Sequence, residues 1–166
     1  EVDWVDVNQL LEETLVLLGK KLKQSRHKVV VSFDSALPLI RARADQLRQV
    51  FLNLIINAQQ AMKGEGSIKI STSTYEQALQ PSIVIQMSDT GVGISEEDLP
   101  RIFEPFFSTG KKGTGLGLWV TQDIVRQHGG RIEVTSEPGK GTVFSIILQV
   151  ESPVLEAQDK DKRTIR

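Results

Sequence analysis

Residues 45–62 form a long helical pattern in which a strip of amide side chains runs between apolar ones. At 100° per residue, the apolar side chains of this pattern fill one broad face of a helix. The strip, called here the amide strip, consists of Gln46, Gln49, Asn53, Asn57 and Gln60. Leu52 and Ile56 lie beyond it, so apolar residues flank the strip on both sides. Because a solvated face more often carries Lys and Glu, and because Asn is unfavourable inside helices, the strip needs partners in the folded protein.

Asn53 and Asn57 are one helical turn apart and can direct their carbonyl oxygens at one point. Neutral oxygen ligands suit an Mg²⁺ ion that also holds several waters and substrate phosphates. An asparagine pair that bonds to neighbouring backbone explains the same residues equally well. This segment alone does not distinguish a metal ligand from a structural hydrogen bond.

The hydrophobic periodicity elsewhere predicts one mixed α/β domain, which suits a chain of 166 residues. A helix is expected over residues 6–24, and another that ends at His128, whose imidazole can cap helix carbonyls before Gly129. A short helix start is expected at residues 95–98. Strands are expected at residues 28–34, 39–43, 67–75, 82–88, 131–136 and 142–150. Residues 151–166 are polar and aperiodic, which predicts a solvated tail or linker after a domain over residues 1–150.

Composition excludes several classes of site. With 20 Lys and Arg against 21 Asp and Glu, the net charge is −1, which gives no electrostatic footprint for nucleic acid or anionic lipid. There is no cysteine, so disulfides, thiol nucleophiles and Cys-ligated metals are excluded. No apolar run is long enough to cross a bilayer, and the N-terminus has neither an initiator Met nor a basic signal region. We therefore expect a piece of a longer protein that makes no membrane contact itself.

Two glycine-rich segments are candidates for ligand binding. The first, Asp89-Thr90-Gly91-Val92-Gly93-Ile94, follows a strand, and its carboxylate can accept from an exocyclic amine while the glycines let backbone approach a ring. The second, Gly113-Thr114-Gly115-Leu116-Gly117-Leu118, opens a helix, where free N–H groups favour an anion. Neither matches the dinucleotide or P-loop spacing. Each segment alone is a weak signal, since most such strings are turns.

Five segments in order resemble the catalytic and ATP-binding domain of sensor histidine kinases, over about residues 5–150. Residues 53–58 resemble the N box, 89–93 the G1 box, 103–107 (Phe-Glu-Pro-Phe-Phe) the F box, 113–118 the G2 box and 139–142 the last glycine motif. The resemblance implies the Bergerat ATP-binding fold shared with gyrase B, Hsp90 and MutL. That fold is an α/β (α+β) two-layer sandwich, with a mixed sheet of about five strands and three helices on one face.

The resemblance implies ATP and Mg²⁺ as ligands, with Asn57 as the metal ligand, Asp89 on the adenine amine and Thr142 supporting the adenine end through a water. The glycines of the G2 box would bind phosphates through backbone N–H groups. The catalytic residues it implies are Asn57, Lys111 and Lys112. The nucleotide-binding residues it implies are Asn53, Asn57, Gln60, Asp89, Gly91, Gly93, Ile94, Phe107, Lys111, Lys112, Gly113, Thr114, Gly115, Leu116, Gly117, Leu118 and Thr142.

Departures from the family pattern bear on mechanism. Hydrolases of the fold carry a glutamate base one turn before the Mg²⁺ asparagine, where this chain has Asn53, and an amide cannot take a proton at neutral pH. Many kinases carry Lys and an aromatic where Gln60 and Ala61 stand here. The short segment between Phe107 and Gly113, which resembles the lid of nitrogen-regulation kinases, therefore supplies the candidate cations. Either Lys111 or Lys112 would reach the γ-phosphate, although a solvated loop charge is an equally good reading of each.

The resemblance thus predicts a histidine kinase catalytic domain that transfers the γ-phosphoryl group of ATP to a histidine. No helical segment with a His followed by an acidic residue occurs, so the acceptor is expected on a dimerisation domain outside this chain. The other expected partners are ADP and, indirectly, a response regulator, with the piece itself monomeric and cytoplasmic and its parent free to be membrane-anchored. The alternative function is a nucleotide-sensing module without transfer activity.

Overall fold

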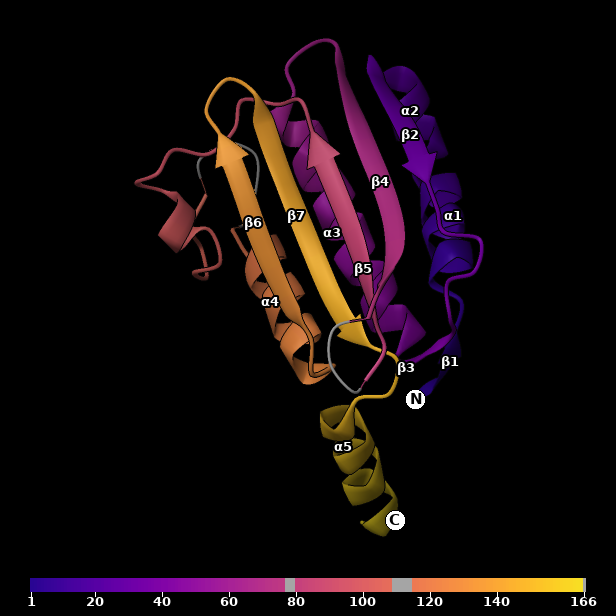
Figure 1. Ribbon diagram of the computed structural model, residues 1–166. Helices are drawn as coiled ribbons and strands as arrows, with labels where there is room; N and C mark the ends of the chain where they lie inside the picture. The colour runs from indigo at the N-terminus through magenta and orange to yellow at the C-terminus, as the bar shows by residue number, and fades with distance from the viewer. Residues whose placement is uncertain (77–79, 109–114, 166) are drawn as a thin grey trace.

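The computed structural model describes residues 1–76, 80–108 and 115–165, and Figure 1 shows the arrangement of the elements along the chain. The strands are β1 (Asp3–Val5), β2 (His27–Ser32), β3 (Ile40–Ala42), β4 (Gly66–Tyr75), β5 (Ser82–Asp89), β6 (Arg131–Glu137) and β7 (Gly141–Gln149). The α-helices are α1 (Val7–Leu17), α2 (Gly19–Gln24), α3 (Ala44–Ala61), α4 (Gly117–Gln127) and α5 (Pro153–Thr164). A 3₁₀ turn covers Leu99–Arg101.

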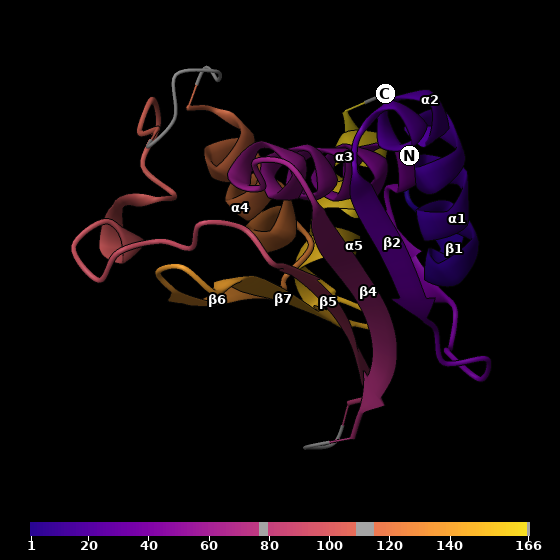
Figure 2. The same ribbon diagram turned by 90° about the horizontal axis from the view of Figure 1, so that it is seen from above.

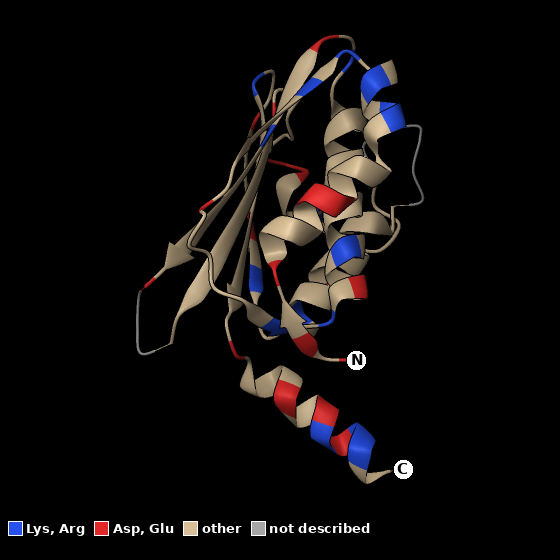
Figure 3. Cartoon of the chain, turned by 90° about the vertical axis from the view of Figure 1, so that its right-hand side faces the viewer, with Lys and Arg blue, Asp and Glu red and all other residues tan. Residues whose placement is uncertain are grey.

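Five strands form one mixed sheet in the order β2-β4-β5-β7-β6. β2 runs parallel to β4, and the other neighbours are antiparallel. Helices α1, α3 and α4 lie on one face of this sheet, as Figures 2 and 3 show from two directions. The expected two-layer sandwich is therefore confirmed.

The core lies between the sheet and α3. Alternate side chains of the central strands point to the helical layer, because successive residues of a strand face opposite sides. Among them Ile68, Ile70, Ile83 and Ile85 have no exposed surface. The apolar face of α3 meets them with Leu47, Val50, Phe51, Leu54 and Ile55, which are at most 1 % exposed. Burial of this face turns the amide strip of α3 toward α4 and the loops around it.

Three predicted elements differ from the structure. The helix expected over residues 6–24 breaks at Leu18 into α1 and α2, at a junction followed by Gly19, a poor helix former. The expected strand at 39–43 is the three-residue β3, which pairs with β1 in a separate ribbon. β1 was not predicted, because three residues are too short to show alternation. The helix start expected at residues 95–98 is followed only by the 3₁₀ turn at Leu99–Arg101.

Residues 153–164, expected to belong to a polar tail, form helix α5. Ser152 caps it by accepting a hydrogen bond from the Leu155 N–H, and Pro153 occupies the first helical position. Leu155 is fully buried, whereas the later turns carry charges of both signs (Figure 3). Because half of the residues of α5 are charged, its average hydrophobicity is low, and the pattern did not indicate that Leu155 anchors a helix. No helix in the described ranges is both long and apolar enough to span a membrane.

Candidate functional site

A buried carboxylate stands at the end of β5. Asp89 is 7 % exposed, and its Oδ1 accepts a hydrogen bond of 2.9 Å from the Gly91 N–H. Burial raises the pKa of Asp89, and the backbone hydrogen bonds from Gly91 and Thr142 oppose that rise. The carboxylate is thus an acceptor in a poorly solvated place. Such a group favours a ligand that brings an N–H donor.

Ser136 connects the surroundings of Asp89. Its hydroxyl lies 3.0 Å from the Gly141 carbonyl and 2.8 Å from the Thr142 hydroxyl, and it accepts from the Ile94 N–H at 2.7 Å. Two predicted site residues, Ile94 and Thr142, are therefore held through one serine. Sequence analysis missed Ser136. The signal that could have found it is its register opposite Thr142 at the end of a hairpin.

The loop after Asp89 is fixed on both sides. The Val92 N–H donates to the Ala61 carbonyl at the end of α3 (2.9 Å), and the Val92 carbonyl accepts from the Gly139 N–H (2.8 Å). A Cβ at Gly91 would lie 2.5 Å from the Ala61 carbonyl oxygen, so any side chain there would push the loop off α3. The G1 segment is therefore a rigid bridge between α3 and the β6–β7 turn.

The amide strip of α3 meets the N-terminus of α4. Asn53 Nδ2 donates to the Gly117 carbonyl at 3.2 Å, and the Thr121 hydroxyl donates to the same carbonyl at 2.8 Å. The structural partner that the sequence analysis left open is thus present for Asn53. Asn57 lies one turn further along α3 and is half-buried, whereas Gln60 is exposed. Thr121, one turn into α4, is a second residue that sequence analysis missed.

Phe106 and Gly115, which have positive φ angles, lie side by side before α4. The Phe106 N–H donates to the Gly115 carbonyl at 3.0 Å, and Phe106 has a φ of +65°, which is rare for a non-glycine residue. Gly115 has a φ of +71°, and a Cβ there would lie 2.5 Å from the Phe106 carbonyl carbon. Glycine is therefore required at this position. The Arg101 guanidinium lies over the ring of Phe107, which follows Phe106 in the F box, at 4.6 Å from the ring centroid.

The structure brings seven of the predicted residues into two groups that α3 connects. One group is Asp89 with Gly91, Gly93, Ile94 and Thr142, and the other is Asn53 with Gly117. Leu116 and Leu118 flank the start of α4 and are half-buried. Gln60 makes no contact with either group that the structure records. Lys111, Lys112, Gly113 and Thr114 lie outside the described residues.

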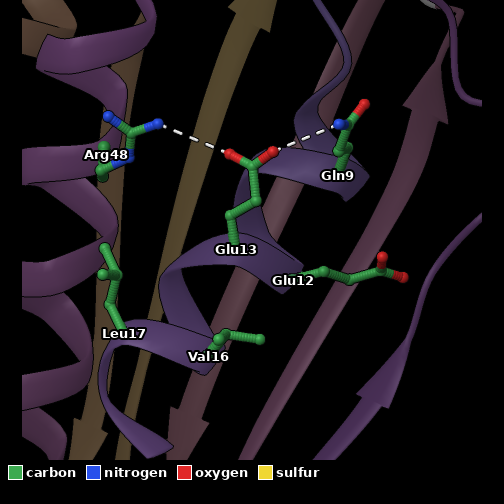
Figure 4. A pocket seen from close by; sticks show the side chains of 6 residues that line it. All are labelled: Gln9, Glu12, Glu13, Val16, Leu17 and Arg48. Atoms are coloured by element: carbon green, nitrogen blue, oxygen red, sulfur yellow. Dashed lines mark hydrogen bonds and ion pairs between the residues drawn. The ribbon is translucent and has the colours of Figure 1, made fainter.

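A hollow in the described surface lies elsewhere, between α1 and α3. It has a volume of about 570 Å³ and is lined by Gln9, Glu12, Glu13, Val16, Leu17 and Arg48 (Figure 4). Arg48 and Glu13 form an ion pair across it at 3.5 Å. None of the predicted site residues lines it.

Comparison with known proteins identifies the family of this chain. The model of the family described as histidine kinase-, DNA gyrase B-, and HSP90-like ATPase matches residues 42–152. The signal transduction histidine-protein kinase AtoS of Escherichia coli (strain K12) is 42 % identical over 146 residues, which are 88 % of this chain and 24 % of AtoS. The chain thus spans about a quarter of that relative.

Solved structures give the same result. The catalytic domain of histidine kinase ThkA has a TM-score of 0.79 and 30 % identity, over 92 % of this chain and 99 % of that domain. Full-length ShkA in complex with AMPPNP has a TM-score of 0.80 and 27 % identity, over 92 % of this chain and 32 % of ShkA. ThkA in complex with the response regulator protein TrrA has a TM-score of 0.75 and 27 % identity, over 90 % of this chain and 42 % of that one.

The chain belongs to the histidine kinase-, DNA gyrase B- and HSP90-like ATPase family. Within that family it corresponds to the ATP-binding catalytic domain of two-component sensor histidine kinases, in sequence and over nearly the full length of such a domain.

Proposed function

We propose that this chain binds Mg-ATP and transfers the γ-phosphoryl group to a histidine on a separate dimerisation domain of its parent kinase. The observation that carries the proposal is the combination of a buried acceptor, Asp89, with an amide, Asn53, where hydrolases of the fold have a base. Asp89 would bind the nucleotide. Asn53 leaves no group at that position to activate water.

The adenine ring would be bound by Asp89, Gly91, Gly93 and Thr142. A buried carboxylate accepts from the exocyclic amine of adenine, whereas guanine would present a carbonyl oxygen to it. Because Ser136 fixes Thr142 and Ile94, this end is formed before the ligand arrives. Preformed sites lose less free energy to ordering when a ligand binds.

The phosphates would lie at the N-terminus of α4, whose first N–H groups have no partner within the helix. Asn57, half-buried one turn from Asn53, is the proposed protein ligand for Mg²⁺. A single amide oxygen fits this ion, because Mg²⁺ usually keeps several waters and takes its other ligands from substrate phosphates. When bound, the ion would neutralise charge on the phosphates during transfer. Lys111 and Lys112 remain the proposed cations for the γ-phosphate.

In the proposed reaction, the acceptor imidazole nitrogen forms a bond to the γ-phosphorus as the bond to the β,γ-bridging oxygen breaks, and ADP leaves. The catalytic domain holds the donor in line and contributes no base. A response regulator would later take the phosphoryl group from the histidine. Residues 1–150 form the proposed catalytic unit. Residues 151–166, which include α5, follow it.

The proposal is tested by mixing the chain with a histidine-bearing dimerisation domain and γ-labelled ATP. Acid-labile, base-stable phosphohistidine is expected with the wild type and not with Asn57→Asp. Glu137→Gln is the matched control, because Glu137 is an exposed carboxylate at the rim that pairs with Lys140. Tight ATP binding without phosphohistidine would instead favour a nucleotide-sensing module.

A further inference from the structure

Two polar links join α4 to α3, one at each end of α4. At its N-terminal end, Asn53 Nδ2 donates to the Gly117 carbonyl. At its C-terminal end, His128 Nε2 accepts a hydrogen bond of 3.1 Å from the Arg43 N–H, directly before α3. The two helices therefore run antiparallel. They lie side by side in Figure 2.

The His128 ring is held in one state. It is 3 % exposed, and Nδ1 lies 2.9 Å from the Ile124 carbonyl one turn back in α4. Because Nε2 accepts from Arg43, the ring is neutral with its proton on Nδ1. The Arg43 N–H precedes the first turn of α3 and has no partner within that helix. His128 thus satisfies a buried donor that would otherwise be unpaired.

We infer that His128 is a positioning residue for the nucleotide site. By fixing α4 against the start of α3, it sets the separation between Asn57 and the phosphate-binding end of α4. The inference rests on the proposed binding of ATP at that end. His128 itself is far from the proposed phosphate site, since the 11 residues of α4, Gly117–Gln127, span about 16 Å of helix.

Helix α5 supports the same corner. The Arg43 guanidinium donates to Gln158 Oε1 at 3.4 Å, and a Cβ at Gly129 would overlap the hydroxyl of Ser152, the α5 cap. The residue after His128 therefore has to be glycine for α5 to dock. Arg43 is held from two sides, by His128 through its backbone and by α5 through its side chain.

Two amide substitutions separate positioning from general stability. His128→Asn keeps a group at the place of Nδ1 that can donate to Ile124, but it does not reach Arg43. His128→Gln places an amide oxygen near Nε2, where it can accept from the Arg43 N–H. The variants differ by one methylene group. Gln127→Ala is the control, since Gln127 bonds to Asp123 within α4.

AMPPNP affinity is measured by calorimetry at 15 °C, after circular dichroism has shown that each variant is folded. If ligand binding has to restore the position of α4 that this bond fixes, the cost of one buried hydrogen bond is subtracted from the binding free energy, and His128→Asn should bind up to about tenfold more weakly. His128→Gln should remain within about threefold of the wild type, and Gln127→Ala should be unchanged. A purely structural role would lower the melting temperature of His128→Asn and leave its affinity intact, and that result would overturn the inference.

Coupling between the two links gives a second test. Sites this far apart normally have additive effects. If both links act by placing α4, the effects of Asn53→Ala and His128→Asn on AMPPNP affinity should be non-additive. Once one link is lost and α4 is displaced, the loss of the other link should weaken binding by less than it does alone. Additive effects would refute common positioning. Absence of binding by the wild type would refute the proposed function itself, and this inference with it.

Discussion

Replacing Asp89 by Asn changes one atom of the proposed adenine site and nothing in its volume. The carboxylate accepts from the Gly91 N–H through Oδ1, and it also has a backbone hydrogen bond from Thr142. An asparagine has one acceptor oxygen. If that oxygen stays with the Gly91 N–H, the NH₂ group faces the remaining donors, including the adenine amine. The variant therefore places donor against donor.

The size of the effect follows from burial. A hydrogen bond to a charged group contributes about 1.5–3 kcal/mol, and Asp89 is nearly shielded from the water that could replace a lost partner. ATP affinity should therefore fall roughly 10- to 150-fold. Glu137→Gln, at the exposed rim, should change it by less than about twofold.

Calorimetric titration with AMPPNP, ADP and GTP checks this reasoning. AMPPNP and ADP should lose affinity equally in Asp89→Asn, since both carry adenine. GTP should bind poorly to the wild type, because its exocyclic oxygen would face the carboxylate. Equal affinity of the wild type for ATP and GTP, or an Asp89→Asn variant within threefold of the wild type, would refute the assignment of Asp89.

The raised pKa of Asp89 adds a pH signature to the same variant. A carboxyl whose folded pKa lies above its ordinary value of 3.8 contributes stability that is fully present below that value and is lost as pH rises through the folded pKa. Asparagine does not titrate. The unfolding free energy of Asp89→Asn relative to the wild type should therefore shift in favour of the variant as pH rises through this window. A difference that is constant with pH would contradict the burial argument.

Three further predictions concern other parts of the site. Asn57→Asp should disturb ATP binding more than ADP binding in calorimetry, because the metal matters most where phosphate charge is greatest; equal effects would remove Asn57 as the ligand. Burial lowers the pKa of His128, so its contribution to the unfolding free energy is complete above pH 6.5 and is lost as pH falls through the folded pKa. Thermal melts of the wild type should show that loss, and those of His128→Gln should not. Leu155→Ala removes the buried anchor of α5, which should free the helix to exchange its amide hydrogens without unfolding the sheet, and unchanged protection of α5 would contradict its docking.

The sequence predicted the parts of this site that lie within one element or one turn. Asn53 and Asn57 were visible as a polar strip within one helix, and Asp89 as a carboxylate at the end of a strand. Capping of a carbonyl by His128 was also predicted, and the Ile124 contact confirms it. Its other partner, Arg43, is 85 residues away in the chain, and no local pattern connects them.

Ser136 and helix α5 were missed for different physical reasons. Ser136 acts through a hydroxyl whose partners come from β7 and the G1 loop, so its role exists only once the hairpin has formed. In α5, one buried leucine anchors twelve mostly charged residues, and an average over the segment predicts a solvated tail. Both cases are tertiary contacts that local periodicity does not record.

The contacts of Asn53 explain why a carboxylate base would not fit at this position. Its amide donates to the Gly117 carbonyl at 3.2 Å, and that carbonyl already accepts from Thr121. A glutamate reaching the same point would set an ionised acceptor against a carbonyl acceptor in a half-buried place, which is unfavourable. It would have to turn away, and the link that holds α4 to α3 would be lost. In this chain a donor that joins the two helices stands at this position, which supports the proposal that the nucleophile comes from another domain.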